Sequence, residues 1–106
     1  MAQTPEGKVK DKLKKLLKEH NVYYEMPVPT GFGKSSLDFV CCIYGLYFQV
    51  ETKAGKKVMS PRQKQIANKV KEAGGRAFLY NDDPKVNEEL EQWLKVISQS
   101  LGNLSL

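Results

Sequence analysis

The chain has 106 residues, of which 41% are hydrophobic, enough to build one compact core but not two. Seventeen Lys and Arg residues against twelve Asp and Glu residues give a formal net charge of +5, which favours a polyanionic partner. No segment is long and apolar enough to span a membrane, and the lysine-rich N-terminus lacks the apolar core of a signal peptide. We therefore expect one soluble, cytoplasmic domain over residues 1–106.

The first predicted element is a helix that begins at Thr4-Pro5 and runs to about Glu19. Thr4 is a suitable N-cap and Pro5 a suitable first residue. On a helical wheel Glu6 lies on the apolar stripe, whereas Asp11 and Glu19 lie well away from it; the stripe comprises Val9, Leu13, Leu16 and Leu17. Glu6 can therefore serve as a charge at the helix N-terminus, as a member of a site, or as both.

Three extended segments follow, over Val22–Val28, Leu37–Tyr44 and Leu46–Lys53, with an irregular stretch at Pro27–Ser36 between the first two. A tight turn at Tyr44-Gly45 predicts that the second and third segments pair as an antiparallel hairpin.

The only two cysteines, Cys41 and Cys42, are adjacent in the second extended segment. A bridge between neighbours would be strained, and no third or fourth Cys or His ligand accompanies them. We expect reduced thiols.

A second helix is predicted to begin at Ser60-Pro61-Arg62-Gln63, where Gln63 completes a capping box, and to stop at Gly74-Gly75. Arg76–Asn81 predicts a fourth strand, and Asp82-Asp83-Pro84 leads into a final amphipathic helix. Its apolar positions are Val86, Leu90, Trp93, Leu94, Ile97 and Leu101. The order predicts an α/β fold, a mixed sheet covered by helices.

Two acids and a lysine are predicted to meet on the hairpin. Alternation puts Glu51 and Lys53 on one face of their strand, and pairing across Tyr44-Gly45 brings Asp38 opposite the Glu51 region. Carboxylate pairs of this kind hold Mg²⁺, and Lys53 could orient or activate an attacking water. Taken alone, an acid and a lysine with this spacing on a strand are usually only a solvated charge pair, and Asp38 only an acid at a strand end.

Gln63 supports the interpretation of these residues as an active site. It lies on the helical stripe of Ile66, Ala67 and Val70, so it faces the sheet as well as capping its own helix.

Several segments in this order resemble the VRR-NUC family of the PD-(D/E)xK nuclease superfamily, over about residues 4–81. They are Glu6, Gly31–Asp38, Val50–Lys56, Ser60–Gln63 and Ala73–Gly75. The resemblance implies an αβββαβ restriction-endonuclease-like core with an additional C-terminal helix here. It also implies a dependence on Mg²⁺, which Mn²⁺ could replace, and a phage-encoded or bacterial homodimer that cuts branched DNA such as four-way (Holliday) junctions.

Carried over by position, Asp38 and Glu51 would bind the metal, with Thr52 also at a metal-binding position, and Lys53 would be the catalytic lysine. Glu6 and Gln63 would be the helix-borne members of the site. Two residues depart from the family pattern: Leu37 replaces the usual proline, and Thr52 replaces an apolar residue. By alternation the Thr52 side chain should face away from the metal.

The loop before Asp38 and the segment after Lys53 are the expected DNA contacts, through Lys34, Ser35, Ser36, Lys56 and Lys57. A flexible connection and solubilising lysines are the plain alternatives. Four aromatic residues are expected to pack in the core or loops rather than to stack on bases: Tyr23, Tyr24, Phe32 and Tyr44.

The leading hypothesis is a metal-dependent endodeoxyribonuclease acting on branched DNA. The alternatives are a nuclease of the same fold acting on ends, flaps, mismatches or linear duplex, a non-catalytic DNA-binding module, and an RNA-binding or structural protein. Paired carboxylates facing phosphate argue against a simple binding module, because such a module has no use for them.

Overall fold

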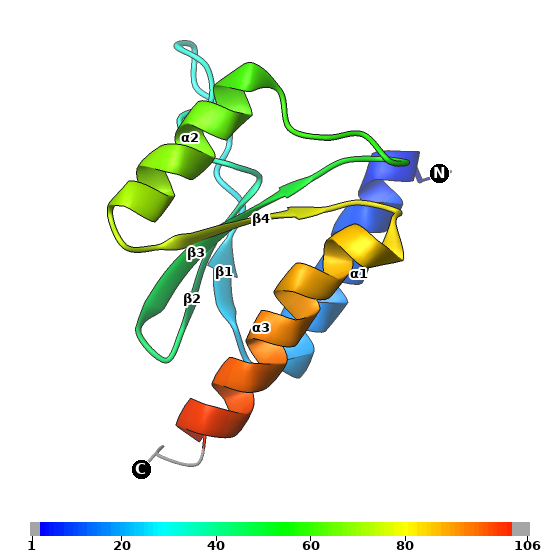
Figure 1. Ribbon diagram of the computed structural model, residues 1–106. Helices are drawn as coiled ribbons and strands as arrows, with labels where there is room; N and C mark the ends of the chain where they lie inside the picture. The colour runs from blue at the N-terminus through cyan, green and yellow to red at the C-terminus, as the bar shows by residue number, and fades with distance from the viewer. Residues whose placement is uncertain (1–2, 103–106) are drawn as a thin grey trace.

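The computed structural model describes residues 3–102 and places helices on both faces of a four-stranded sheet (Figure 1). The elements are α1 (Pro5–Glu19), β1 (Tyr23–Glu25), β2 (Phe39–Ile43), β3 (Leu46–Thr52), α2 (Pro61–Glu72), β4 (Arg76–Tyr80) and α3 (Pro84–Gly102). The strand order is β1-β2-β3-β4, with antiparallel pairing up to β3 and parallel pairing of β3 with β4. The predicted α/β fold with a mixed sheet and an additional C-terminal helix is confirmed.

The main core lies between the sheet and the helices α1 and α3. It contains Leu13 and Leu17 of α1, Leu90 and Leu94 of α3, and the ring of Phe48 on β3, all fully buried. A smaller cluster of Leu37, Ile66, Ala67 and Ala77 lies on the opposite face, under α2. Residues on β3 alternate between these two faces, so the sheet separates two chemically different surfaces.

The β2–β3 hairpin has the predicted tight turn at Tyr44 and Gly45. Their φ angles of 49° and 82° are both left-handed, as a two-residue type I′ turn requires. Ile43 therefore pairs directly with Leu46, which fixes the register of every later pair in the ladder.

The helix ends also follow the predicted capping. The Thr4 hydroxyl accepts from the backbone N–H of Gly7 at 3.0 Å, and Ser60 and Gln63 form the reciprocal capping box. After α2, Gly74 adopts a φ of 96°. A Cβ on Gly75 would lie 3.1 Å from the Tyr47 carbonyl oxygen, so the second glycine allows α2 to end close against β3.

All four strands are shorter than predicted, β3 and β4 by one residue each at their ends. β1 ends at Glu25 rather than Val28, since Pro27 and Pro29 cannot donate to the ladder. β2 begins at Phe39 because the chain bends at Asp38.

Helix α3 packs its buried residues Leu90 and Leu94 on its own sheet, with Trp93 and Ile97 half-buried beside them. Leu104 and Leu106, which extended the predicted apolar surface, lie outside the described residues. Cys41 and Cys42 are both free thiols, as expected. Within residues 3–102, no helix has the length and apolar character needed to cross a membrane.

Candidate active site

Asp38 and Glu51 lie side by side at one end of the β2–β3 hairpin. Phe39 pairs with Val50, so the next step along both strands sets Asp38 beside Glu51. The backbone N–H of Asp38 donates to Glu51 Oε1 at 3.1 Å. The two residues are only 7% and 3% exposed, so two carboxylates are held together in a largely water-excluded position. This juxtaposition of Asp38 and Glu51 is as predicted from the sequence.

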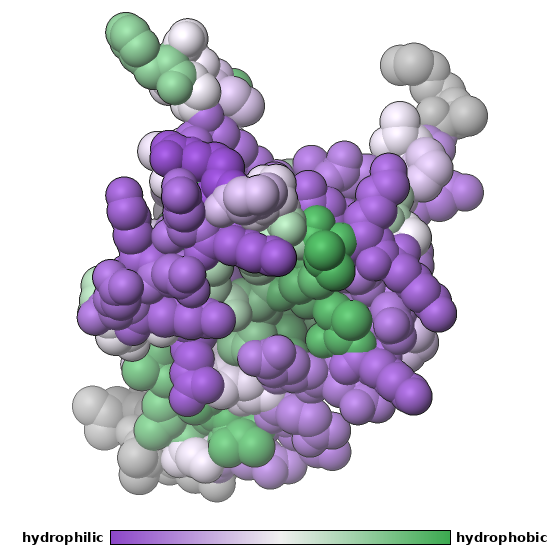
Figure 2. Space-filling view, turned by 45° about the horizontal axis from the view of Figure 1, so that its top comes forward, coloured by the Kyte–Doolittle hydropathy of each residue, from purple (hydrophilic) through white to green (hydrophobic). Residues whose placement is uncertain are grey.

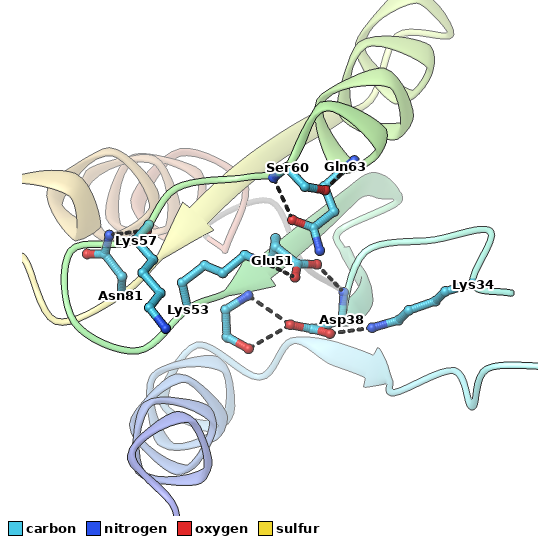
Figure 3. A network of polar contacts seen from close by, with 9 residues as sticks. Lys34, Asp38, Glu51, Lys53, Lys57, Ser60, Gln63 and Asn81 are labelled. Atoms are coloured by element: carbon cyan, nitrogen blue, oxygen red, sulfur yellow. Dashed lines mark hydrogen bonds and ion pairs between the residues drawn. The ribbon is translucent and has the colours of Figure 1, made fainter.

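The Asp38 carboxylate is surrounded by donors (Figure 3). Its Oδ2 accepts from the Thr52 backbone N–H at 3.0 Å and from the Thr52 hydroxyl at 2.7 Å, while Oδ1 pairs with the Lys34 ammonium. The prediction that the Thr52 side chain would face away from the acids is therefore wrong. Asp38 precedes the regular ladder at a bend, so its side chain reaches across the end of β3 and is not governed by alternation.

Lys53 follows directly after β3 and remains near Glu51. Its Nζ lies 3.8 Å from Glu51 Oε2, on the same face as predicted. Its backbone N–H donates to the Tyr80 carbonyl at 3.1 Å, so β4 holds the main chain at this position. The sheet thus fixes the backbone from which the ammonium reaches Glu51.

The two carboxylates have opposite pKa shifts. Burial and the negative charge of Asp38 raise the pKa of Glu51 to about 7, against the opposing charges of Lys34 and Lys53. Burial alone would raise the pKa of Asp38, but the hydrogen bonds from Lys34 and Thr52 outweigh it and hold that pKa below its usual value. Near neutral pH, Asp38 is ionised and Glu51 is poised between its two forms, an arrangement that occurs often at functional sites.

Gln63 approaches this pair from the start of α2. Its side-chain Oε1 accepts from the Ser60 backbone N–H at 2.8 Å. The amide nitrogen of Gln63 therefore points away from Ser60. Figure 3 shows that nitrogen turned toward Glu51. The Gln63 side chain therefore caps α2 and also lies at the candidate site.

Apart from Lys34, the other predicted site residues make no hydrogen bond or ion pair with Asp38 or Glu51. Glu6 is exposed in the first turn of α1 and makes no hydrogen bond or ion pair with another residue of the described chain, so its site role stays a prediction. Ser35 is exposed, and the Ser36 hydroxyl donates to the Leu37 carbonyl at 3.0 Å. Lys56 and Lys57 are exposed on the segment after Lys53, and the Lys57 carbonyl accepts from Asn81. Lys34 alone of the five expected DNA contacts touches the acids.

A cleft of about 350 Å³ between the β1–β2 loop and α2 was not predicted. Loop residues that include Phe32 and Lys34 line one side, and Arg62 and Gln63 line the other. From the sequence, Arg62 is predicted only as part of a helix start. The signal that could have identified it is its position directly before Gln63, at a helix N-terminus that faces the acids.

The donor set suits a hard divalent cation. Asp38 and Glu51 supply oxygen ligands, and Mg²⁺ commonly uses one or two carboxylates and completes its shell with water and substrate phosphate. Within residues 3–102 no group of three or more His, Cys, Asp and Glu side chains is placed to share a metal. The chemistry of this pair therefore fits Mg²⁺ or Mn²⁺ rather than a thiolate- or imidazole-bound metal.

A mixed sheet with two acids and a lysine at the end of its central hairpin defines an α/β domain of the expected nuclease-like architecture. No family model matches the sequence, and no curated protein sequence matches it significantly. A solved structure described as a VRR_NUC domain is similar, with a TM-score of 0.64, 14% identity, and coverage of 92% of this chain and 97% of that chain. The chain thus has the fold of a VRR_NUC domain, as the resemblance in sequence implied.

Proposed function

We propose that this protein is a metal-dependent endonuclease that hydrolyses DNA phosphodiester bonds. The observation that carries the proposal is the arrangement of Asp38, Glu51 and Lys53, in which two buried carboxylates with opposed pKa shifts lie beside a lysine ammonium. The name of the VRR_NUC structure adds support, because that name denotes a nuclease domain. The net charge of +5 is consistent with a nucleic-acid substrate.

Each residue has a role in this proposal. Asp38 and Glu51 would hold Mg²⁺, which when bound offsets charge on the phosphate and lowers the pKa of water. Lys53 would orient the attacking water, whose oxygen forms a bond to phosphorus as a phosphorus–ester oxygen bond breaks. The water loses a proton and the leaving oxygen gains one. Thr52 keeps Asp38 in position through its two hydrogen bonds.

The decisive test is cleavage of four end-labelled DNAs: a four-way junction, a splayed duplex, a linear duplex and a single strand. We expect cleavage with Mg²⁺ or Mn²⁺, none with EDTA, and a preference for the branched substrates. Equal cleavage of all four would retain the nuclease and reject branch selectivity. No cleavage of any substrate, with binding intact, would instead favour a DNA-binding module.

Lys34 gives a separate prediction about the metal. Because its ammonium pairs with Asp38, a divalent cation must compete with it for that carboxylate. Lys34→Gln should therefore raise Mg²⁺ affinity about 5- to 10-fold, which corresponds to an ion pair worth about 1 kcal/mol. The same change should weaken DNA binding. Isothermal titration of Mn²⁺ and salt-dependent DNA binding measure the two effects.

Lys14→Gln is the matched control, because Lys14 pairs with Asp11 on the exposed side of α1 at 3.9 Å. It should leave metal affinity unchanged. Equal metal affinity of the wild type and Lys34→Gln would show that Lys34 does not compete with the cation.

We also propose that the active species is a homodimer. Paired incision of a junction requires two sites in fixed relation, and one domain of 12.0 kDa presents one acidic pair. Sedimentation equilibrium at micromolar concentration tests this assembly. A 12.0 kDa species that makes only unpaired nicks would reject it.

A further inference from the structure

Phe32 is the most exposed aromatic residue in the described chain, at 104% relative exposure. It was expected to pack in the loop, and that expectation is wrong. Figure 1 shows the segment between β1 and β2 projecting beyond α2, and Figure 2 shows hydrophobic surface at the corresponding projection, above a largely hydrophilic face. An aromatic ring held in water forgoes the free energy that burial would provide, so the ring remains available for a partner to cover.

The backbone holds this ring in a defined position. Phe32 lies at the tip of a tight turn in which the Gly33 N–H donates to the Thr30 carbonyl at 3.0 Å. The Thr30 hydroxyl accepts from the Phe32 N–H at 3.3 Å and donates to the Gly33 carbonyl at 3.2 Å. Gly33 has a φ of 92°, which a glycine adopts without strain. The hydrogen bonds of this turn thus hold the backbone of Phe32 in place, with the ring exposed to solvent.

The turn is tied to the acidic site. Lys34 follows Phe32 by two residues and pairs with Asp38. Two residues of extended chain span about 7 Å, and a DNA strand rises about 3.4 Å per nucleotide. The Lys34 side chain adds to this span, so the ring lies within several nucleotides of a phosphate placed beside Asp38 and Glu51.

The surroundings of the ring match the chemistry of unpaired DNA. The cleft that Phe32 borders has Ile66 in its wall, the cations Lys34 and Arg62, and Gln63, which it shares with the acidic site. None of the residues that line it is an acid. An aromatic face beside basic side chains is the combination that binds single-stranded nucleic acid, through stacking and backbone contacts.

We propose that Phe32 stacks on an unpaired or unstacked nucleobase next to the cleaved phosphate and so selects DNA whose base stack is interrupted. This inference rests on the proposed nuclease function and specifies its substrate class. Bases inside a continuous duplex are already stacked, and separating them costs free energy that a branch point, mismatch or single strand has already spent. The ring therefore favours interrupted DNA over linear duplex.

The test uses duplexes with 2-aminopurine at an unpaired position, with Ca²⁺ in place of Mg²⁺ so that binding is measured apart from cleavage. Wild-type protein should quench the 2-aminopurine fluorescence, Phe32→Ala should not, and Phe32→Tyr should restore quenching. With Mg²⁺, Phe32→Ala should reduce the ratio of kcat/KM for interrupted over linear DNA by about 5- to 150-fold, the range of one base–aromatic stack.

Val28→Ala is the matched control, because Val28 is 83% exposed in the same loop but does not line the cleft. It should change neither signal. Unaltered quenching and an unaltered ratio in Phe32→Ala would overturn the proposal. The two proposals fail separately, since a wild-type protein that binds and quenches but never cuts would reject the nuclease and retain the stacking site.

Discussion

Glu51→Gln is expected to abolish cleavage while making the metal-free fold more stable at pH 8. Loss of a carboxylate from the pair should reduce kcat by at least about 10³-fold, equivalent to about 4 kcal/mol of transition-state stabilisation. Stability should change in the opposite direction because the ionised Glu51 is a buried charge beside Asp38. A glutamine has the shape of the protonated acid, and its side-chain oxygen can still accept from the Asp38 N–H.

The direction of the stability change follows from the direction of the Glu51 pKa shift. The pKa of Glu51 rises from an ordinary 4.5 to about 7 on folding, so folding favours the protonated form. Its contribution to stability is fully present below pH 4.5 and is lost as pH rises through about 7. The whole difference is about 3 kcal/mol, and this figure already includes the opposing attraction of Lys53.

Urea unfolding at pH 4.5 and pH 8, without divalent metal, measures this effect. The two proteins should be about equally stable at the lower pH, and the variant should be more stable by about 3 kcal/mol at the higher. Mg²⁺ should raise the Tm of the wild type alone, with an affinity that increases as pH rises through about 7. A variant that cuts at the wild-type rate would refute the assignment of Glu51 to the site.

Lys53→Met should reduce cleavage by about 10²- to 10⁴-fold, the usual contribution of a group that orients or transfers a proton in the reaction. Metal binding should survive, because both carboxylates remain. The loss of a cation 3.8 Å from Glu51 should raise the pKa of Glu51 further and so move metal binding to higher pH. Single-turnover cleavage and Mn²⁺ titration over a pH series separate the two effects.

Lys57→Met is the control for charge alone. Lys57 is exposed on the following segment, and its contact in the polar network is through its backbone carbonyl. This variant should bind DNA slightly less tightly, with the slope of log affinity against log salt reduced by about 1 if Lys57 meets a phosphate. Its single-turnover rate should be unchanged. An equal loss of single-turnover rate in Lys53→Met and Lys57→Met would show that Lys53 acts only as a surface charge.

Local chemistry explains which parts of the fold could be predicted from sequence. The capping residues Thr4 and Ser60, the turn at Tyr44-Gly45 and the shared face of Glu51 and Lys53 depend on neighbours in the chain, and the structure agrees with each. Periodicity likewise identified the faces of α1 and α3 that are buried.

The differences arise where the chain leaves regular structure. Thr52 reaches Asp38 because of a bend whose geometry no periodicity describes. The exposure of Phe32 depends on how the turn closed by Thr30 and Gly33 projects from the sheet, and an aromatic among glycines is equally compatible with packing. Arg62 lines a cleft only because α2 starts opposite that turn.

The parallel pairing of β3 with β4 affects the order in which the parts of the candidate active site can form during folding. Asp38, Glu51 and Lys53 all precede β4 in the sequence. The main chain at Lys53, however, is held by a hydrogen bond to Tyr80 of β4. The segment after it is joined to the start of α3, where Asp82 N–H donates to the Gly55 carbonyl at 2.9 Å and Gly55 N–H donates to the Asp82 carboxylate at 2.6 Å. A chain still being synthesised can therefore form the β2–β3 hairpin that holds the two acids before β4 is available to fix the main chain at Lys53.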